Sequence, residues 1–141
     1  MHNCLVGSEM CIRDSKDDSL NDPLVTESQI STFEWATETE LGEIFEIALR
    51  TNDFLCGLLS AVNLTLVDFK IEIGRSFRSE GEKLIIADEI SPDTCRLWDS
   101  KTKKRLDKDV FRLNEGSISI AYTEVADRFD LLPKNVRSAV R

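Results

Sequence analysis

The spacing of the apolar residues changes once along this chain, and the change falls next to Leu64. Before Leu64, apolar residues recur at steps of three and four, which places them on one face of a long helix. From residue 64 to residue 73, apolar and polar residues alternate instead, as they do in a strand with one buried face. A long helix followed by strands predicts an α+β fold, with an antiparallel sheet flanked by helices. The helical stripe comprises Leu41, Phe45, Ala48, Asn52, Leu55, Leu59 and Val62.

Short local patterns predict where the helices begin. Residues 26–29 and 37–40 both have the Thr-x-x-Gln/Glu form of a capping box. The first box predicts a short helix that runs towards Trp35, and the second predicts the start of the long helix. Further along, the charged segment 101–112 is expected to end in a helical turn, and a final helix is expected after Gly116.

The strands are expected to form one hairpin. Residues 83–90 have the composition of a second strand, which would pair with residues 64–73 across a polar loop at 74–81. Residues 91–99 are expected to be irregular.

Composition restricts the classes of function. The net charge of −8 and the isoelectric point near 4.7 argue against a general binder of nucleic acid or of anionic membranes, which needs an excess of lysine and arginine. No apolar run approaches the ~20 residues that span a bilayer. The single histidine, His2, lies in the doubtful N-terminal segment, which weakens any mechanism that depends on histidine.

The first fifteen residues do not continue the pattern of the rest. Residues 1–15 have no helix or strand period, and "SEMCIRDS" resembles the translation of a sequencing adapter. We therefore expect residues 1–15 to be adapter-derived or disordered. Residues 16–141 are then expected to be the C-terminal part of a longer protein.

One face of the predicted strand carries Asp68, Lys70 and Glu72. Cross-strand neighbours lie ~4.5–5.5 Å apart, so the hairpin would bring Asp88 or Glu89 close to Glu72. Two carboxylates that close repel each other, and a divalent cation would relieve the repulsion. The apolar residues of the opposite, buried face would be Val67, Phe69, Ile71 and Ile73.

An alternative stays open at this point. Alternating charges are typical of a solvated face, where neighbouring acids and bases neutralise one another without a ligand. A register slip of one residue would also send Asp88 to the opposite face. The spacing alone does not decide between the two.

Four segments resemble the C-terminal half of the SAICAR synthetase (phosphoribosylaminoimidazole-succinocarboxamide synthase) family. They are "KDDSLNDPLV", "LVDFKIEIG", "IIADEISPDTCRLWD" and "LDKDVFR", in the family's order and spacing, and the similarity covers residues 16–129. The resemblance implies a fold related to ATP-grasp enzymes and a cytoplasmic, ATP-dependent ligase of purine biosynthesis. It would join L-aspartate to carboxyaminoimidazole ribonucleotide, with ATP as co-substrate and Mg²⁺ as cofactor. These small molecules are the implied partners, without nucleic acid or membrane, and a homo-oligomer stays open.

The resemblance also implies roles for individual residues. Glu72 and Asp88 match the magnesium ligands. Lys70 and Asp68 match catalytic positions, where Lys70 helps to hold the ribonucleotide and Asp68 lines the same site. The residues that match substrate-binding positions are Arg96, Asp109, Arg112, Lys16 and Asp22.

Two departures from the family pattern matter. Leu113 is followed by Asn114 and Glu115 where the family commonly has two glycines, so we expect a modest change of turn. The family's N-terminal ATP-binding lobe has no counterpart in these residues, so we expect the fragment itself to be inactive. The alternatives are a phosphotransferase of the inositol-polyphosphate kinase type and a non-catalytic acidic interaction module.

Overall fold

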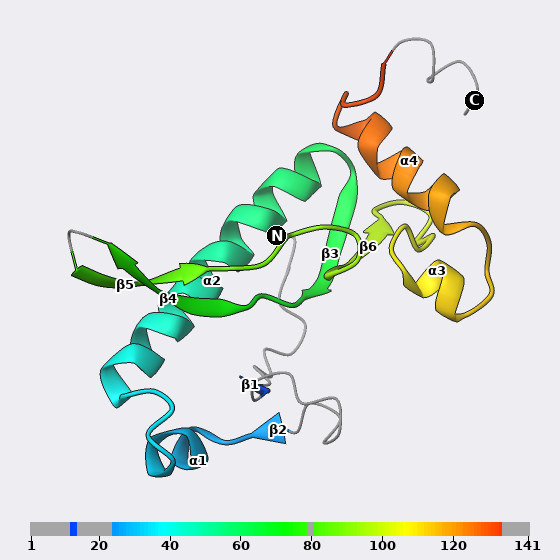
Figure 1. The fold of residues 1–141 in the computed structure, drawn as a ribbon. Coiled ribbons are helices and arrows are strands. Elements are labelled where there is room, and N and C mark those ends of the chain that lie inside the picture. Colours follow the sequence, from blue (N-terminus) through cyan, green and yellow to red (C-terminus); the bar gives the residue numbers. More distant parts are fainter. Residues whose placement is uncertain (1–11, 14–23, 79–80, 134–141) are drawn as a thin grey trace. The chain divides into compact units, whose positions relative to one another are not determined.

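The computed structural model describes residues 12–13, 24–78 and 81–133. The chain divides into two compact units, Met1–Leu49 and Arg50–Arg141. The long helix α2 (Glu38–Ala61) begins in the first unit and ends in the second (Figure 1). We describe each unit by itself.

The first unit contains a short strand pair and two helix starts. β1 (Ile12–Arg13) pairs antiparallel with β2 (Leu24–Val25), and α1 follows as Glu27–Thr32. Both predicted capping boxes are confirmed. Thr26 and Gln29 cap α1 reciprocally, and Thr37 and Glu40 do the same for α2, with N–H···O distances of 2.7 and 3.2 Å.

The cap of α2 leads to a prediction about stability. Replacing Thr37 with alanine removes the hydroxyl that accepts the Glu40 N–H, so we expect the free energy of unfolding to fall by about 1 kcal/mol. Urea denaturation of the chain measures the change. Thr39→Ala is the matched control, because Thr39 is also exposed in the first turn of α2. Equal losses in the two variants would contradict a capping role for Thr37.

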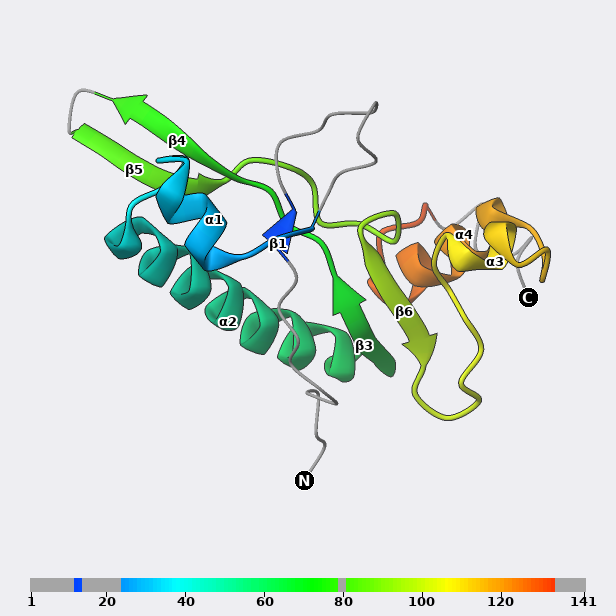
Figure 2. The same ribbon diagram turned by 90° about the horizontal axis from the view of Figure 1, so that it is seen from below.

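The second unit contains two antiparallel strand pairs. β3 (Leu64–Phe69) pairs with β6 (Cys95–Asp99), and β4 (Ile73–Arg78) pairs with β5 (Gly81–Ile86). Figure 2 shows β3 and β6 as neighbouring arrows of opposite direction.

The strand pairing corrects three expectations. Residues 64–73 are not one strand, because β3 ends at Phe69 and β4 begins at Ile73. The partner of β3 is β6, which occupies most of the segment expected to be irregular. β4 takes up most of the segment expected to be a loop and forms the hairpin with β5. The predicted hairpin therefore exists, but it starts at Ile73.

Two helices complete the second unit. α3 (Asp109–Arg112) and α4 (Ile118–Arg128) pack beside each other (Figure 1), and both were expected. The buried apolar side chains of this unit are Leu55, Leu59, Leu64, Leu66, Cys95, Leu97, Leu106, Val110, Ala121 and Val125.

The turn between α3 and α4 shows how the missing glycines are replaced. Asn114 has a φ of 56°, the left-handed conformation that glycine usually supplies at a helix end. The N–H of Asn114 donates to Phe111 O, and that of Glu115 donates to Val110 O, at 3.1 and 2.8 Å. These two bonds form a Schellman motif, and asparagine tolerates it because its short polar side chain is compatible with positive φ.

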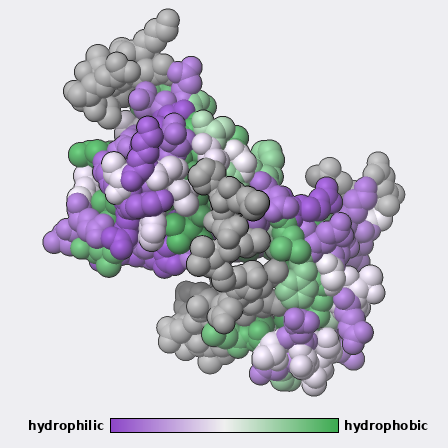
Figure 3. Space-filling model, turned by 180° about the vertical axis from the view of Figure 1, so that it is seen from behind, coloured by the Kyte–Doolittle hydropathy of each residue, from purple (hydrophilic) through white to green (hydrophobic). Residues whose placement is uncertain are grey.

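The surface combines hydrophilic and apolar areas. On the face shown in Figure 3, hydrophilic residues cover much of the surface, and apolar residues lie between them in smaller areas. Within the described residues, no helix is long and apolar enough to cross a membrane.

Candidate functional site

A β-bulge in β3 brings two of the predicted site residues together. Leu66 pairs with Leu97 and Asp68 pairs with Arg96, so Val67 is an extra residue without a partner position in β6. Without the bulge, Asp68 would lie opposite Cys95, whose side chain is buried. The extra residue turns Asp68 to the outer face, where its carboxylate meets Arg96.

The bulge also corrects the predicted buried face. Leu64 and Leu66 are buried, whereas Val67 is 40% exposed, so the alternation that placed Val67 in the core is wrong at this position. After the bulge, Phe69, Ile71 and Ile73 are half-buried and not fully buried as predicted.

Four predicted site residues form one chain of ion pairs, which we call the Arg96 cluster: Asp68, Arg96, Asp109 and Arg112. Arg96 donates from Nη1 to Asp68 at 2.5 Å and from Nε to Asp109 at 2.8 Å. Arg112 donates to the other oxygen of Asp109 at 3.3 Å. The cluster joins β3, β6 and α3, of which only β6 and α3 follow each other in the chain.

The pKa shifts of Asp109 and Arg96 both favour the charged forms of these two side chains. The hydrogen bond from Arg96 is the largest cause that lowers the pKa of Asp109, and Arg112 contributes in the same direction. The hydrogen bond to Asp109, followed by the charge of Asp68, raises the pKa of Arg96. Exposed ion pairs contribute little to stability, and three of the four side chains are about half exposed. The cluster therefore serves mainly to orient its members.

Lys70 and Glu72 lie in the short segment that connects the two strand pairs. Their side chains form an ion pair at 2.6 Å. The N–H of Lys70 donates to Thr94 O at 2.7 Å, just before β6, and the C=O of Glu72 accepts the N–H of Ala87 at 2.9 Å, just after β5. The connecting backbone is thus attached on both sides.

Asp88 lies one residue beyond that last attachment. The residue directly opposite Glu72 is Ala87, and not Asp88 or Glu89 as the predicted hairpin had it. Asp88 follows Ala87, half-buried, where β5 has already ended. Within the part of the chain that the structure describes, there is no group of three or more Asp, Glu, His or Cys side chains that could hold a metal ion. Lys16 and Asp22 lie outside the described residues.

Asp107 and Asp93 were not among the site residues predicted from the sequence. The Asp107 side chain is fully buried and accepts two backbone N–H groups. Asp93 accepts a hydrogen bond from the Tyr122 hydroxyl at 2.7 Å; burial of Tyr122, followed by this bond, raises the pKa of the phenol, which therefore stays protonated. A possible signal for Asp93 was the Ser-Pro-Asp-Thr sequence, in which the Ser91 hydroxyl accepts the Asp93 N–H at 3.1 Å.

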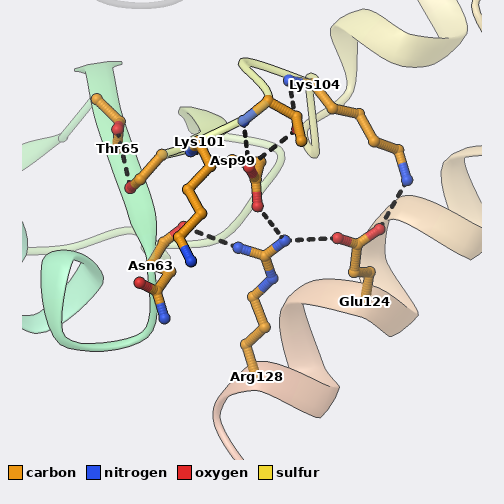
Figure 4. A network of polar contacts seen from close by, with 9 residues as sticks. Asn63, Thr65, Asp99, Lys101, Lys104, Glu124 and Arg128 are labelled. Atoms are coloured by element: carbon orange, nitrogen blue, oxygen red, sulfur yellow. Dashed lines mark hydrogen bonds and ion pairs between the residues drawn. The ribbon is translucent and has the colours of Figure 1, made fainter.

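A second polar network lies away from the Arg96 cluster, around Arg128 of α4 (Figure 4). Arg128 donates to Asp99, to Glu124 and to the C=O of Asn63, at 2.6, 2.6 and 2.8 Å. Lys104 also pairs with Glu124, at 2.7 Å. Because the network ties α4 to β6 and to the turn before β3, we interpret it as structural.

Comparison with known proteins identifies the family of this chain. The model of the SAICAR synthetase family matches residues 9–129; the match begins within the segment expected to be foreign. A curated relative from Dinoroseobacter shibae, phosphoribosylaminoimidazole-succinocarboxamide synthase, is 55% identical over 120 residues, which are 85% of this chain and 47% of the relative. The relative of the same name from Ruegeria pomeroyi is 54% identical over 126 residues, 89% of this chain and 49% of the relative.

Solved structures give the same result. The crystal structure of phosphoribosylaminoimidazole-succinocarboxamide synthase from Ehrlichia chaffeensis superposes with a TM-score of 0.79 and 48% identity, over 84% of this chain and 50% of that one. A SAICAR synthetase solved in complex with ADP has a TM-score of 0.74 and 43% identity, over 79% and 46% of the two chains.

The fold and the site define an α+β protein whose paired strands carry a charged, ion-paired outer face. The chain belongs to the SAICAR synthetase family. It spans about half the length of the curated relatives it matches. The two alternatives, an inositol-polyphosphate kinase-like enzyme and a non-catalytic module, gain no support from these matches.

Proposed function

We propose that the complete protein containing this chain is an ATP-dependent, cytoplasmic ligase of purine biosynthesis. It joins L-aspartate to carboxyaminoimidazole ribonucleotide and releases SAICAR, ADP and phosphate. The curated relatives carry the name of this enzyme, and one solved relative holds ADP. The observation that carries the proposal is the Arg96 cluster, in which four residues assigned to the site by the resemblance meet in a family member.

The reaction requires several anionic groups to be held close together. A carboxylate oxygen of the ribonucleotide attacks the γ-phosphorus of ATP, and ADP leaves. The amine of aspartate then attacks the acyl phosphate carbon, loses a proton, and phosphate leaves as the amide forms. Holding these groups in place replaces an improbable encounter of three substrates.

The cationic side chains of this chain are suited to that task. Arg96 uses Nε and one Nη1 hydrogen in its bonds to Asp109 and Asp68, and a guanidinium has five N–H donors. The two carboxylates therefore fix the plane of the guanidinium, and its remaining N–H groups donate to a substrate carboxylate or phosphate. Lys70 and Arg112, each more than half exposed, add positive charge for the same substrates.

Glu72 and Asp88 would hold the magnesium ion. The donor set fits, because Mg²⁺ uses one or two protein carboxylates and completes its shell with water and substrate phosphate. The absence of a larger acidic cluster among the described residues is compatible with such a site. When bound, the ion offsets the charge of the phosphoryl oxygens.

The test uses a hybrid enzyme, defined as the Dinoroseobacter shibae relative with its 120 matching residues replaced by those of this chain. We expect the hybrid to form SAICAR from ATP and aspartate. We expect the double variant Glu72→Gln, Asp88→Asn to lose roughly 100-fold or more of kcat, because the charge of the phosphates is no longer offset. Calorimetric titration of Mg²⁺ in the presence of ADP measures metal binding separately.

The matched control is Glu82→Gln, which removes a carboxylate of the same hairpin that is paired with Arg75. This control should keep both activity and metal binding. Full activity of the double variant would overturn the metal assignment, and an inactive hybrid would overturn the proposed function. The 141-residue chain alone should show little or no turnover.

A further inference from the structure

We infer that Asp107 is a positioning residue, which holds the Arg96–Asp109 pair in the geometry that binds the ribonucleotide. The inference rests on the proposed function and adds a residue to which neither the motifs nor the family resemblance assigned a role. The Asp107 carboxylate binds backbone N–H groups, of Leu97 and of Asp109, and not the side chains of the pair. It acts through the backbones of the segments that carry the pair.

Asp107 is buried, and its carboxylate binds two backbone segments. Its side chain is 0% exposed. One carboxylate oxygen accepts the N–H of Leu97 at 2.8 Å, and the other accepts the N–H of Asp109 at 2.8 Å. Leu97 follows Arg96 directly in β6, and Asp109 is the first residue of α3. The planar Asp107 carboxylate thus sets the distance between the backbone of β6 and that of α3. The Arg96–Asp109 bond joins these same two elements.

The same segment holds Leu97 from its other side. The N–H of Leu106 donates to Leu97 O at 2.8 Å, so both backbone polar groups of Leu97 are bound by residues 106 and 107. The position of Arg96 along β6 is therefore tightly determined. The side chain of Asp109 is only 15% exposed, and its carboxylate accepts a hydrogen bond from Nε of Arg96 at 2.8 Å.

The residue at position 107 is a buried carboxylate. Burying a charged group is costly. An apolar residue of similar size at such a position often gives a fold that is equally stable or more stable. Among the described residues, the hydrogen bonds of the Asp107 side chain come from backbone N–H groups and not from a lysine or arginine. A buried acceptor with two diverging oxygens is what this geometry needs, because it binds two N–H groups from different segments at once.

The first test compares Asp107→Asn with the unchanged hybrid enzyme. Asparagine keeps the shape and one acceptor oxygen, but its amide nitrogen faces one of the two N–H groups and cannot accept from it. We expect KM for the ribonucleotide to rise about 10-fold or more, with KM for ATP nearly unchanged. Leu59→Ala is the control: it creates a cavity at a buried residue of α2 and should lower stability while leaving KM for the ribonucleotide unchanged.

A double-mutant cycle separates positioning from general destabilisation. If Asp107 acts through Asp109, Asp107→Asn should change KM little in a background that already carries Asp109→Asn. Additive effects of the two substitutions, or an unchanged KM in Asp107→Asn, would overturn the inference.

A spectroscopic arm does not depend on activity. The Nε–H of Arg96 should give a slowly exchanging nitrogen–proton NMR signal in the hybrid, and the signal should exchange rapidly in Asp107→Asn. If the unchanged hybrid is inactive, the proposed function fails, and this signal still decides whether Asp107 positions Arg96. An unaltered signal would contradict the inference.

Discussion

Replacing Arg96 with lysine in the hybrid enzyme should lower kcat/KM roughly 100-fold, although lysine keeps the positive charge. Arg96 bonds to Asp68 in β3 and to Asp109 in α3 through two different nitrogens. A lysine ammonium is a single point of charge on a flexible stem, so it cannot reproduce the planar fork between these carboxylates. Steady-state kinetics with varied ribonucleotide concentration measures the effect.

The matched control is Arg75→Lys, at an arginine of β4 that pairs with Glu82 at 3.2 Å. This change should leave kcat/KM within about twofold, because surface ion pairs contribute little. If Arg96→Lys behaves like the control, the Arg96 cluster is a solvated surface feature, as the open alternative in the sequence analysis supposed.

Replacing Arg128 with methionine should lower the free energy of unfolding by about 3 kcal/mol at pH 7. The substitution leaves Asp99, Glu124 and the C=O of Asn63 without the group that donates to all three. Asp99 is only 14% exposed on its side chain, so water replaces the lost partner incompletely. Arg50→Met, at an exposed arginine of α2, is the control and should change stability by less than about 0.5 kcal/mol.

The effect of Arg128→Met should depend on pH with a definite sign. Backbone N–H donation from Thr102, followed by the hydrogen bond from Arg128, lowers the pKa of Asp99 below its ordinary value. A carboxyl with a lowered pKa stabilises the folded state above its unfolded pKa of ~3.9 and loses that contribution as the pH falls. Because Asp99 takes up its proton alike in the two unfolded chains, the difference between the original chain and Arg128→Met should hold down to about pH 4 and shrink below it, where the folded variant protonates Asp99 first. Urea unfolding at pH 7, 5 and 3 measures it, and a difference independent of pH would contradict the role of Asp99.

Local patterns correctly predicted the starts of α1 and α2. Thr26 and Thr37 cap their helices through bonds that span three residues, so short sequence segments contain all the partners. The motif resemblance nominated Asp68, Arg96, Asp109 and Arg112, because residue type and order identify a family even where the geometry is unknown.

The arrangement of these residues required the tertiary structure. The pairing of Leu66 with Leu97, the bulge at Val67 and the buried Asp107 all involve contacts between segments that are distant in the chain. Alternation predicts a strand equally well with or without a bulge, so it misplaced Val67 and missed the change of partner after Phe69. The residue types and local caps were determined by the sequence alone. The partner and register of each strand were decided only by the fold, because they depend on which distant side chains share a buried face.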